Sequence, residues 1–149
     1  MTILADSSIW IDHIRSANPL LEEAISEQRI ICHPMVIGEI AMGSLANRTA
    51  ILRALGKFEQ AKVARDSEVL RLVEDRRLYS LGMGFIDAHL LTSALLTPEC
   101  RLWTRDRRLE AAATSLGGAA ARTHGSGLYG QYLMNNPYGA SPKRILPEC

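Results

Sequence analysis

The chain has 149 residues, of which 47% are hydrophobic and 22% charged, and its 17 Lys and Arg against 16 Asp and Glu give a net charge of +1. This length and composition indicate one globular domain and exclude a disordered chain, a collagen-like repeat and a coiled coil. The balanced charge does not indicate a generally basic nucleic-acid-binding protein, so any contact with nucleic acid must depend on local charge.

The hydrophobic pattern predicts short apolar strands that alternate with helices. The expected strands are residues 2–5, 29–32, 101–104 and 119–121. The expected helices are one that follows the polar residues 6–8, and then 19–27, 34–42, 47–58, 66–78, 86–96 and 107–116. This alternation predicts an α/β domain with a central parallel sheet, in which an active site lies at the carboxyl ends of the strands.

The composition changes after residue 124. Residues 125–149 combine glycine, proline and asparagine with three of the four tyrosines, Tyr129, Tyr132 and Tyr138, and have no sustained apolar period. We therefore expect a folded domain over residues 1–124 and a C-terminal extension over 125–149 that is flexible or depends on a partner.

The chain has three widely spaced cysteines, Cys32, Cys100 and Cys149. This number and spacing do not suit a disulfide framework or a zinc site, and Cys32 and Cys100 are expected to be buried. Asp6 and Asp12 interrupt any apolar leader, and the apolar segment 85–96 is too short and too polar to span a bilayer. These features predict a soluble, cytoplasmic protein.

Four acidic residues lie in positions that are unusual for solvated carboxylates. Asp6 and Asp106 follow predicted strands, whereas Glu39 and Asp87 lie within apolar helical segments. Burial of a carboxylate costs free energy unless hydrogen bonds or a cation compensate for it. Either of the two residues that follow strands, taken alone, is equally well explained as a helix N-cap.

A cluster of these four carboxylates predicts a divalent cation, because the like charges repel one another in its absence. Oxygen ligands suit Mg²⁺ or Mn²⁺ and indicate phosphoryl or phosphodiester chemistry. The chain has no phosphate-binding Gly-rich loop, no nucleophile elbow and no His-Glu-x-x-His motif. His13 and His33 are interpreted as structural residues.

Four segments together resemble the motifs of PIN-domain ribonucleases, and most closely those of VapC-type toxins from bacterial toxin–antitoxin pairs. They are TILADSSIWID at 2–12, VIGEIAMG at 36–43, GFIDAHL at 84–90 and LWTRDRRL at 102–109. Each motif alone is a single acid among apolar residues, but the order and spacing of all four agree over residues 1–124.

The resemblance implies a three-layer fold with a central parallel sheet and an endoribonuclease that depends on Mg²⁺ or Mn²⁺. It implies that Asp6 and Asp87 bind metal most directly. It further implies that Glu39 and Asp106 bind a second ion or orient water, with Thr104 as a nearby polar residue. It also implies a homodimer that is inhibited by a cognate VapB-type antitoxin.

The expected substrate is RNA, hydrolysed by metal-activated water and steered by Arg105, Arg107 and Arg108, whereas Arg76 and Arg77 are better explained as a solvated helix face. Without the four candidate acids, 17 basic residues face 12 acids, which leaves a charge of +5. The alternatives are a catalytically silent RNA- or peptide-binding module on the same fold and a phosphoacceptor domain. The second alternative lacks the paired acid and the lysine that such a domain needs.

Overall fold

The computed structural model describes residues 1–118 and 120, and a three-stranded parallel sheet forms its centre. The strands are β1 (Thr2–Ala5), β2 (Ile30–Ile31) and β3 (Cys100–Trp103), in the order β2-β1-β3. Ile3 pairs with Ile30 on one side of β1, and Leu4 pairs with Leu102 on the other. The strand β2 therefore lies on one side of β1, and β3 lies on the other. This change of direction creates a topological switch point at the carboxyl ends of β1 and β3.

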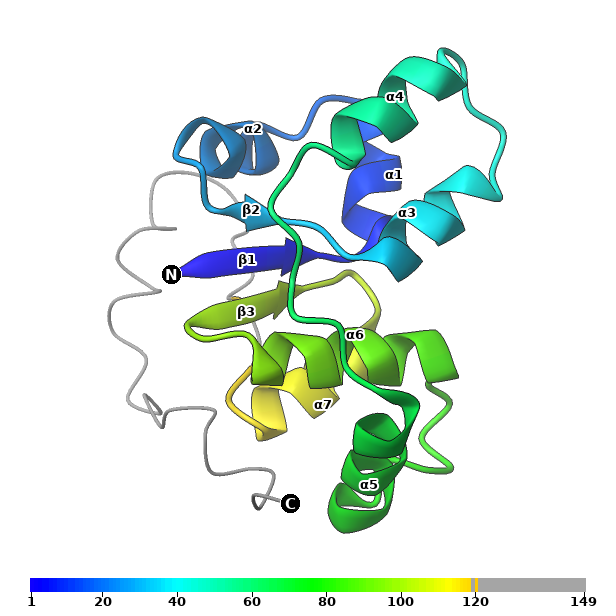
Figure 1. Cartoon of the computed structure of the whole chain (residues 1–149), viewed down its shortest axis with the longest axis vertical. Coiled ribbons are helices and arrows are strands. Elements are labelled where there is room, and N and C mark those ends of the chain that lie inside the picture. The colour runs from blue at the N-terminus through cyan, green and yellow to red at the C-terminus, as the bar shows by residue number, and fades with distance from the viewer. Residues whose placement is uncertain (119, 121–149) are drawn as a thin grey trace.

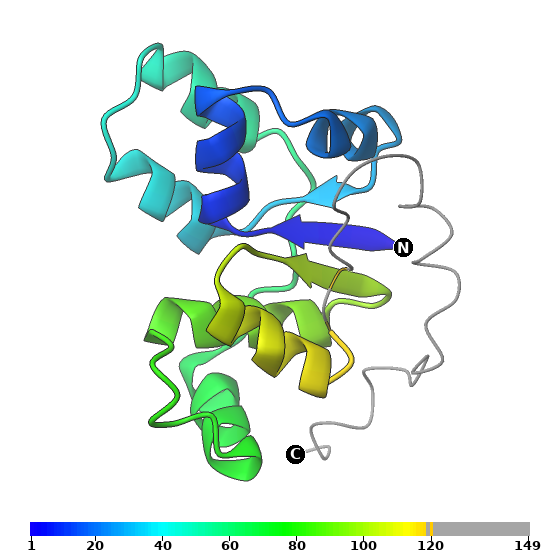
Figure 2. The same cartoon turned by 180° about the vertical axis from the view of Figure 1, so that it is seen from behind.

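Helices cover both faces of this sheet. Within the described residues they are α1 (Ser7–Arg15), α2 (Pro19–Ser26), α3 (Pro34–Ala41), α4 (Arg48–Leu55), α5 (Asp66–Arg76), α6 (Phe85–Leu96) and α7 (Arg107–Ser115). Helix α6 and the connection 56–65 lie across the face seen in Figure 1, and α1 and α7 lie on the opposite side in Figure 2. The predicted α/β architecture with a parallel sheet between helices is confirmed.

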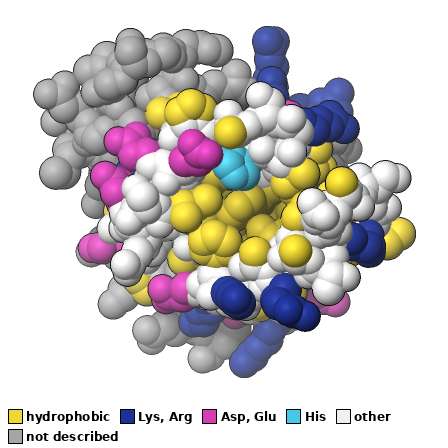
Figure 3. Space-filling model, turned by 90° about the horizontal axis from the view of Figure 1, so that it is seen from above, with side chains coloured by type: hydrophobic (Ala, Val, Ile, Leu, Met, Phe, Trp, Pro, Cys, Tyr) yellow, Lys and Arg dark blue, Asp and Glu magenta, His cyan; other side chains and the backbone are white. Residues whose placement is uncertain are grey.

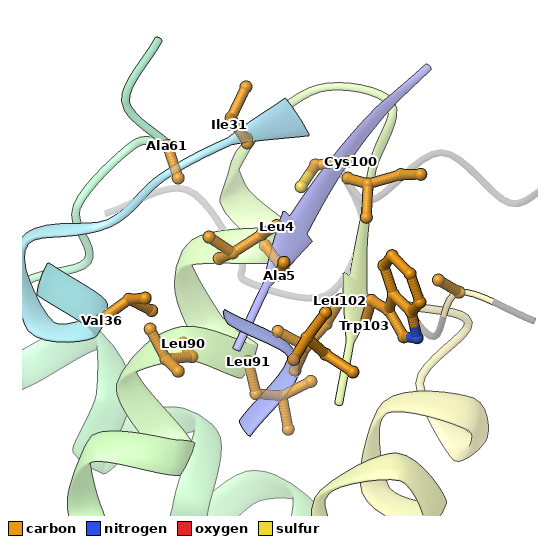
Figure 4. Packing of buried hydrophobic residues seen from close by; sticks show 14 of the residues in the cluster. Leu4, Ala5, Ile31, Val36, Ala61, Leu90, Leu91, Cys100, Leu102 and Trp103 are labelled. Atoms are coloured by element: carbon orange, nitrogen blue, oxygen red, sulfur yellow. The ribbon is translucent and has the colours of Figure 1, made fainter. Parts of the chain in front are cut away.

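The strand β1 and most of α6 lack an exposed polar face because both are buried in the hydrophobic core. Ile3, Leu4 and Ala5 are fully buried between the helical layers, and α6 is buried continuously from Ala88 to Leu95. Figure 4 shows Leu90 and Leu91 of α6 beneath the strands. The apolar segment 85–96 is thus a core helix, and no helix in the described part of the chain is long and apolar enough to cross a bilayer.

The prediction of buried thiols at Cys32 and Cys100 is confirmed. Both side chains are free cysteines inside the core. Burial raises the pKa of the Cys32 thiol, and it raises the pKa of Cys100 to about 11. Both therefore behave as small apolar residues rather than as nucleophiles.

Several elements differ in extent from the predicted ones: the helix expected at 47–58 is α4 (Arg48–Leu55), and the strand expected at 101–104 is β3 (Cys100–Trp103). The strand expected at 29–32 is a two-residue strand, because Cys32 pairs instead with the connection after α4 through its N–H to the Glu59 carbonyl at 2.8 Å. At the other edge, Leu102 accepts from the Ala120 N–H at 2.8 Å, while residues 119 and 121 of the expected last strand lie outside the described residues. So does the extension 125–149.

Candidate active site

The four acids selected from the sequence all lie toward the carboxyl edge of the sheet. Asp6 follows β1, and its N–H continues the β1–β3 ladder by donating to the Trp103 carbonyl at 2.9 Å. Asp106 precedes α7, Glu39 lies in α3, and Asp87 is the third residue of α6. The ends of β1 and β3 and the N-terminus of α6 point to the same side of the molecule in Figure 1.

Asp6 is a buried carboxylate that is satisfied by hydroxyl groups. Its side chain is 5% exposed. It accepts hydrogen bonds from Thr104 Oγ1 at 2.7 Å and Ser8 Oγ at 3.0 Å, and Ser7 Oγ lies 3.2 Å from its Oδ1. Although Asp6 occupies the N-cap position of α1, its side chain makes no capping hydrogen bond. The cap interpretation of Asp6 is therefore wrong, and its carboxylate is held in place by neighbouring side chains.

Asp106, in contrast, does cap its helix. Its Oδ1 accepts from the N–H groups of Arg108 at 2.8 Å and Leu109 at 3.0 Å, as an N-cap residue does. Its own N–H donates to Thr104 Oγ1 at 3.0 Å. Thr104 therefore connects Asp106 to Asp6, and the Asp106 Oδ2 atom takes no hydrogen bond from the described residues.

Glu39 and Asp87 are carboxylates whose ionised form is disfavoured. Burial raises the pKa of Glu39, the hydrogen bond from Ser7 Oγ to Oε2 at 2.9 Å opposes this rise, and the charges of Asp6 and Asp87 add to it. Burial also raises the pKa of Asp87, against the hydrogen bond from the Gly84 N–H at 2.9 Å and with the charges of Asp6 and Asp106. Glu39 thus senses the charges of Asp6 and Asp87, and Asp87 senses those of Asp6 and Asp106.

The donor set of this cluster fits a hard divalent cation. The four side chains offer only carboxylate oxygens, and a bound cation would favour the ionised forms of Glu39 and Asp87, whose pKa values are raised by burial and, to a smaller extent, by the neighbouring carboxylates. Within residues 1–118 and 120, no group of three His, Cys, Asp or Glu side chains forms a ready-made metal site. The residues therefore fit a magnesium or manganese ion by chemistry and charge, and binding would have to draw them closer together.

Ser7 and Ser8 are neighbours of the acids that the sequence reasoning missed as site residues. Ser7 Oγ lies within hydrogen-bonding distance of both Asp6 and Glu39, and Ser8 Oγ donates to Asp6 while accepting from the Arg105 N–H at 3.2 Å. The available signal was a pair of hydroxyl residues directly after an acid at a strand end. That pair was interpreted only as part of a helix cap.

The three arginines proposed to bind RNA have different surroundings. Arg105 forms an ion pair with Asp12. Arg108 Nη1 donates to the Gly82 carbonyl at 3.2 Å, and Arg107 is an exposed residue at the start of α7. Arg76 and Arg77 are also exposed, at the end of α5. The structure thus places Arg107 and Arg108 on the surface beside Asp106.

The histidines named in the sequence have structural partners. His13 Nδ1 accepts from the Asn18 N–H at 3.1 Å. His33 Nδ1 accepts from the Met35 N–H at 3.1 Å, so the neutral ring carries its proton on Nε2, 3.0 Å from Ser93 Oγ. Burial, with a smaller contribution from the nearby His89, lowers the pKa of His33 to about 4.

Comparison with known proteins places this arrangement in a family. No family model matches the chain. The chain is similar to Ribonuclease VapC32 from two strains of Mycobacterium tuberculosis, CDC 1551 / Oshkosh and ATCC 25618 / H37Rv. Each is 46% identical over 119 residues, which cover 80% of this chain and 96% of the relative. Together with the parallel sheet and the four acids in their order, this identity shows that the chain belongs to the VapC-type family of PIN-domain proteins.

Proposed function

We propose that this protein is a divalent-metal-dependent endoribonuclease that acts as the toxin of a type II toxin–antitoxin pair. The observation that carries the proposal is the convergence of four carboxylates from the end of β1, α3, α6 and the β3–α7 connection, where burial and, to a smaller extent, the neighbouring carboxylates raise the pKa values of Glu39 and Asp87. The name of the relatives, Ribonuclease VapC32, supports RNA as the substrate.

Magnesium or manganese, when bound, would supply a Lewis acid for the phosphodiester and lower the pKa of a coordinated water. Asp6 and Asp87 are the proposed principal ligands, with Glu39 and Asp106 as ligands of a second ion or as groups that orient water. Hydroxyl donors fix the Asp6 carboxylate, so its orientation is set before substrate binds. Glu39, whose pKa is raised, is suited to accept a proton from an attacking water.

The experiment that tests this function is cleavage of a labelled single-stranded RNA by the purified protein. We expect cleavage with Mg²⁺ or Mn²⁺, none in EDTA, and recovery when the metal is restored. Asp6→Asn should abolish cleavage while its circular dichroism spectrum matches that of the wild type. Glu22→Gln, which neutralises an exposed carboxylate on α2, is the matched control and should cleave normally.

The outcomes separate the alternatives. RNA binding without cleavage under every metal condition would favour a catalytically silent binding module. Cleavage that resists EDTA, or that persists unchanged in Asp6→Asn, would contradict metal-dependent hydrolysis at this site.

We also propose a cognate VapB-type antitoxin and a homodimer as the protein's assemblies, from the resemblance to VapC-type toxins. Figure 3 supports a protein partner, because the end of the molecule formed by α1, α2 and α4 presents a hollowed apolar face. Partly buried apolar side chains of these helices are Ile11, Ile14, Leu20, Ile25, Ile51 and Leu52. Copurification with a small protein encoded beside this gene, followed by measurement of the mass of the complex, tests both assemblies.

A further inference from the structure

The loop that precedes α6 and the first two residues of that helix carry exposed apolar side chains beside the acids. We call residues 78–86, which extend into the first turn of α6, the aromatic loop. Tyr79 is 51% exposed and Phe85 is 48% exposed, and they are the two exposed aromatic side chains within the described residues. Leu81, at 50%, and Ile86, at 38%, lie on the same loop. Exposed apolar groups of this size, gathered in one segment, indicate a binding surface.

Hydrogen bonds join the aromatic loop to the N-terminal parts of α6 and α7, next to Asp87 and Asp106. The Gly84 N–H donates to Asp87 Oδ2 at 2.9 Å, which ties the loop to the start of α6. The Arg108 guanidinium donates to the Gly82 carbonyl at 3.2 Å, which ties the loop to α7 just after Asp106. The loop therefore has a defined position next to two of the proposed metal-binding carboxylates.

Gly82 permits this close approach to α7. Its φ of +79° is a conformation that residues with a side chain rarely adopt, and a Cβ at this position would lie 2.7 Å from Arg108 Nη1. At the C-terminal end of the loop, the Phe85 ring meets the buried His89 ring edge to face, with centroids 4.8 Å apart. The middle and the C-terminal end of the loop are thus held by specific contacts.

Exposed arginines flank the aromatic loop. Arg76 and Arg77 immediately precede it along the chain, Arg107 and Arg108 lie at the start of α7, and all four are exposed. Arginine near exposed aromatic rings is the combination with which proteins hold single-stranded nucleic acid, because the cations attract phosphates and the rings stack on bases. An apolar surface alone would not select for a polyanion.

We propose that the aromatic loop is the base-binding surface for the RNA substrate, with unpaired bases stacked on Tyr79 and Phe85. Arg107 and Arg108 then contact the phosphates that lead toward Asp87 and Asp106. This inference rests on the proposed ribonuclease function and adds a requirement for single-stranded RNA whose bases are free to stack.

The test separates bases from backbone in a thermodynamic cycle. RNA binding is measured in the Asp6→Asn background, so that cleavage does not interfere, with a labelled oligouridine and with an oligomer of the same length that contains abasic nucleotides. Tyr79→Ala should weaken oligouridine binding by about five- to 150-fold, the range expected for loss of one stacked base, and should leave binding of the abasic oligomer unchanged. Tyr79→Phe should bind like the parent protein.

Leu70→Ala is the matched control, because Leu70 is a 55% exposed apolar residue on α5 outside the loop, and it should affect neither oligomer. Equal effects of Tyr79→Ala on both oligomers, or no effect on either, would overturn the inference. A change in the mass of the assembly on Tyr79→Ala, measured by light scattering, without a base-dependent effect would overturn it in favour of a subunit interface.

The same samples distinguish this inference from the proposed function. A wild-type protein that cleaves RNA with Mg²⁺, combined with no base-dependent effect of Tyr79→Ala, would leave the ribonuclease intact and remove the aromatic loop from recognition. A base-dependent effect in a protein that never cleaves would support the loop as an RNA-binding surface and contradict catalysis.

Discussion

At the scale of single residues, the surroundings of Asp6 distinguish a site acid from a helix cap. Asp6 and Asp106 both stand before a helix, and sequence alone leaves the two interpretations open for each. Asp106 caps α7, whereas Asp6 leaves the helix uncapped and takes hydrogen bonds from the hydroxyl groups of Thr104 and Ser8 instead. Which hydroxyls surround an acid depends on contacts such as Thr104 to Asp6, 98 positions apart in sequence, so periodicity does not reveal them.

Thr104→Val tests the hydrogen bonds by which Thr104 holds Asp6 and Asp106. Valine has nearly the same shape, but it removes the donor to Asp6 and the acceptor of the Asp106 N–H. We expect the free energy of unfolding to fall by about 1 to 3 kcal/mol, the cost of leaving buried polar groups without partners. Urea denaturation in EDTA measures the free energy of unfolding. Thr104→Ser, which keeps the hydroxyl group, should restore most of the lost stability. Equal stability of Thr104→Val and the wild type would refute the role of Thr104 in holding Asp6 and Asp106.

Glu39→Gln tests the effect of burial and of the neighbouring carboxylates on the Glu39 side chain. Because the pKa of Glu39 is raised in the folded protein, the folded state holds this proton more tightly than the unfolded state. In EDTA, the stability of the wild type should therefore fall relative to Glu39→Gln as the pH rises above the ordinary glutamate pKa of 4.5. Denaturation curves at several pH values measure the difference, and Mg²⁺ should reduce it. Parallel curves in EDTA would contradict a raised pKa of Glu39 in the folded protein.

At the scale of elements, a buried polar connection fixes the helices that carry Glu39 and Asp87. His33 caps α3 and reaches Ser93 of α6 at 3.0 Å, and Ser93 Oγ also accepts from the Ala64 N–H at 3.0 Å. The helices themselves were predictable, since apolar period and caps such as Asn18 are local signals. The pairing of Cys32 with residues 59–61 was not, because that segment has no strand pattern of its own.

His33→Asn tests this connection. Asparagine retains a side-chain acceptor for the cap but does not titrate. The pKa of His33 is lowered from 6.5 to about 4, so its stabilising contribution is complete above pH 6.5 and is lost as the pH falls toward 4. In that window the wild type should lose about 2 to 3 kcal/mol relative to His33→Asn. Denaturation from pH 7 to 4.5 measures the loss, and a pH-independent difference between the two proteins would contradict it.

At the scale of the whole molecule, the net charge of +1 combines an acidic group with a more basic remainder. The fold gathers Asp6, Glu39, Asp87 and Asp106 toward one edge of the sheet, and the remaining 17 basic and 12 acidic residues give +5. The four motifs allowed this grouping to be predicted, because the carboxyl ends of parallel strands meet at one edge. The position of the loop 78–86 beside them was not predictable, since it depends on the contact of Arg108 with Gly82.

This charge distribution predicts salt-dependent RNA binding. In the Asp6→Asn background, the affinity for single-stranded RNA should fall as salt rises, because bound arginines displace counterions from phosphates. Arg107→Ala should reduce the slope of log affinity against log salt by about 0.7, the value for one phosphate contact on a single strand. Fluorescence anisotropy at several salt concentrations measures the slope, and an unchanged slope would remove Arg107 from the RNA contacts.

The four carboxylates are proposed to bind a divalent cation, and titration calorimetry with Mn²⁺ tests this binding most directly. We predict saturable binding to the wild type and to Glu22→Gln, and its loss in Asp6→Asn and in Asp87→Asn proteins that remain folded. Absence of binding to the wild type, or the same affinity in the wild type and both variants, would contradict the account.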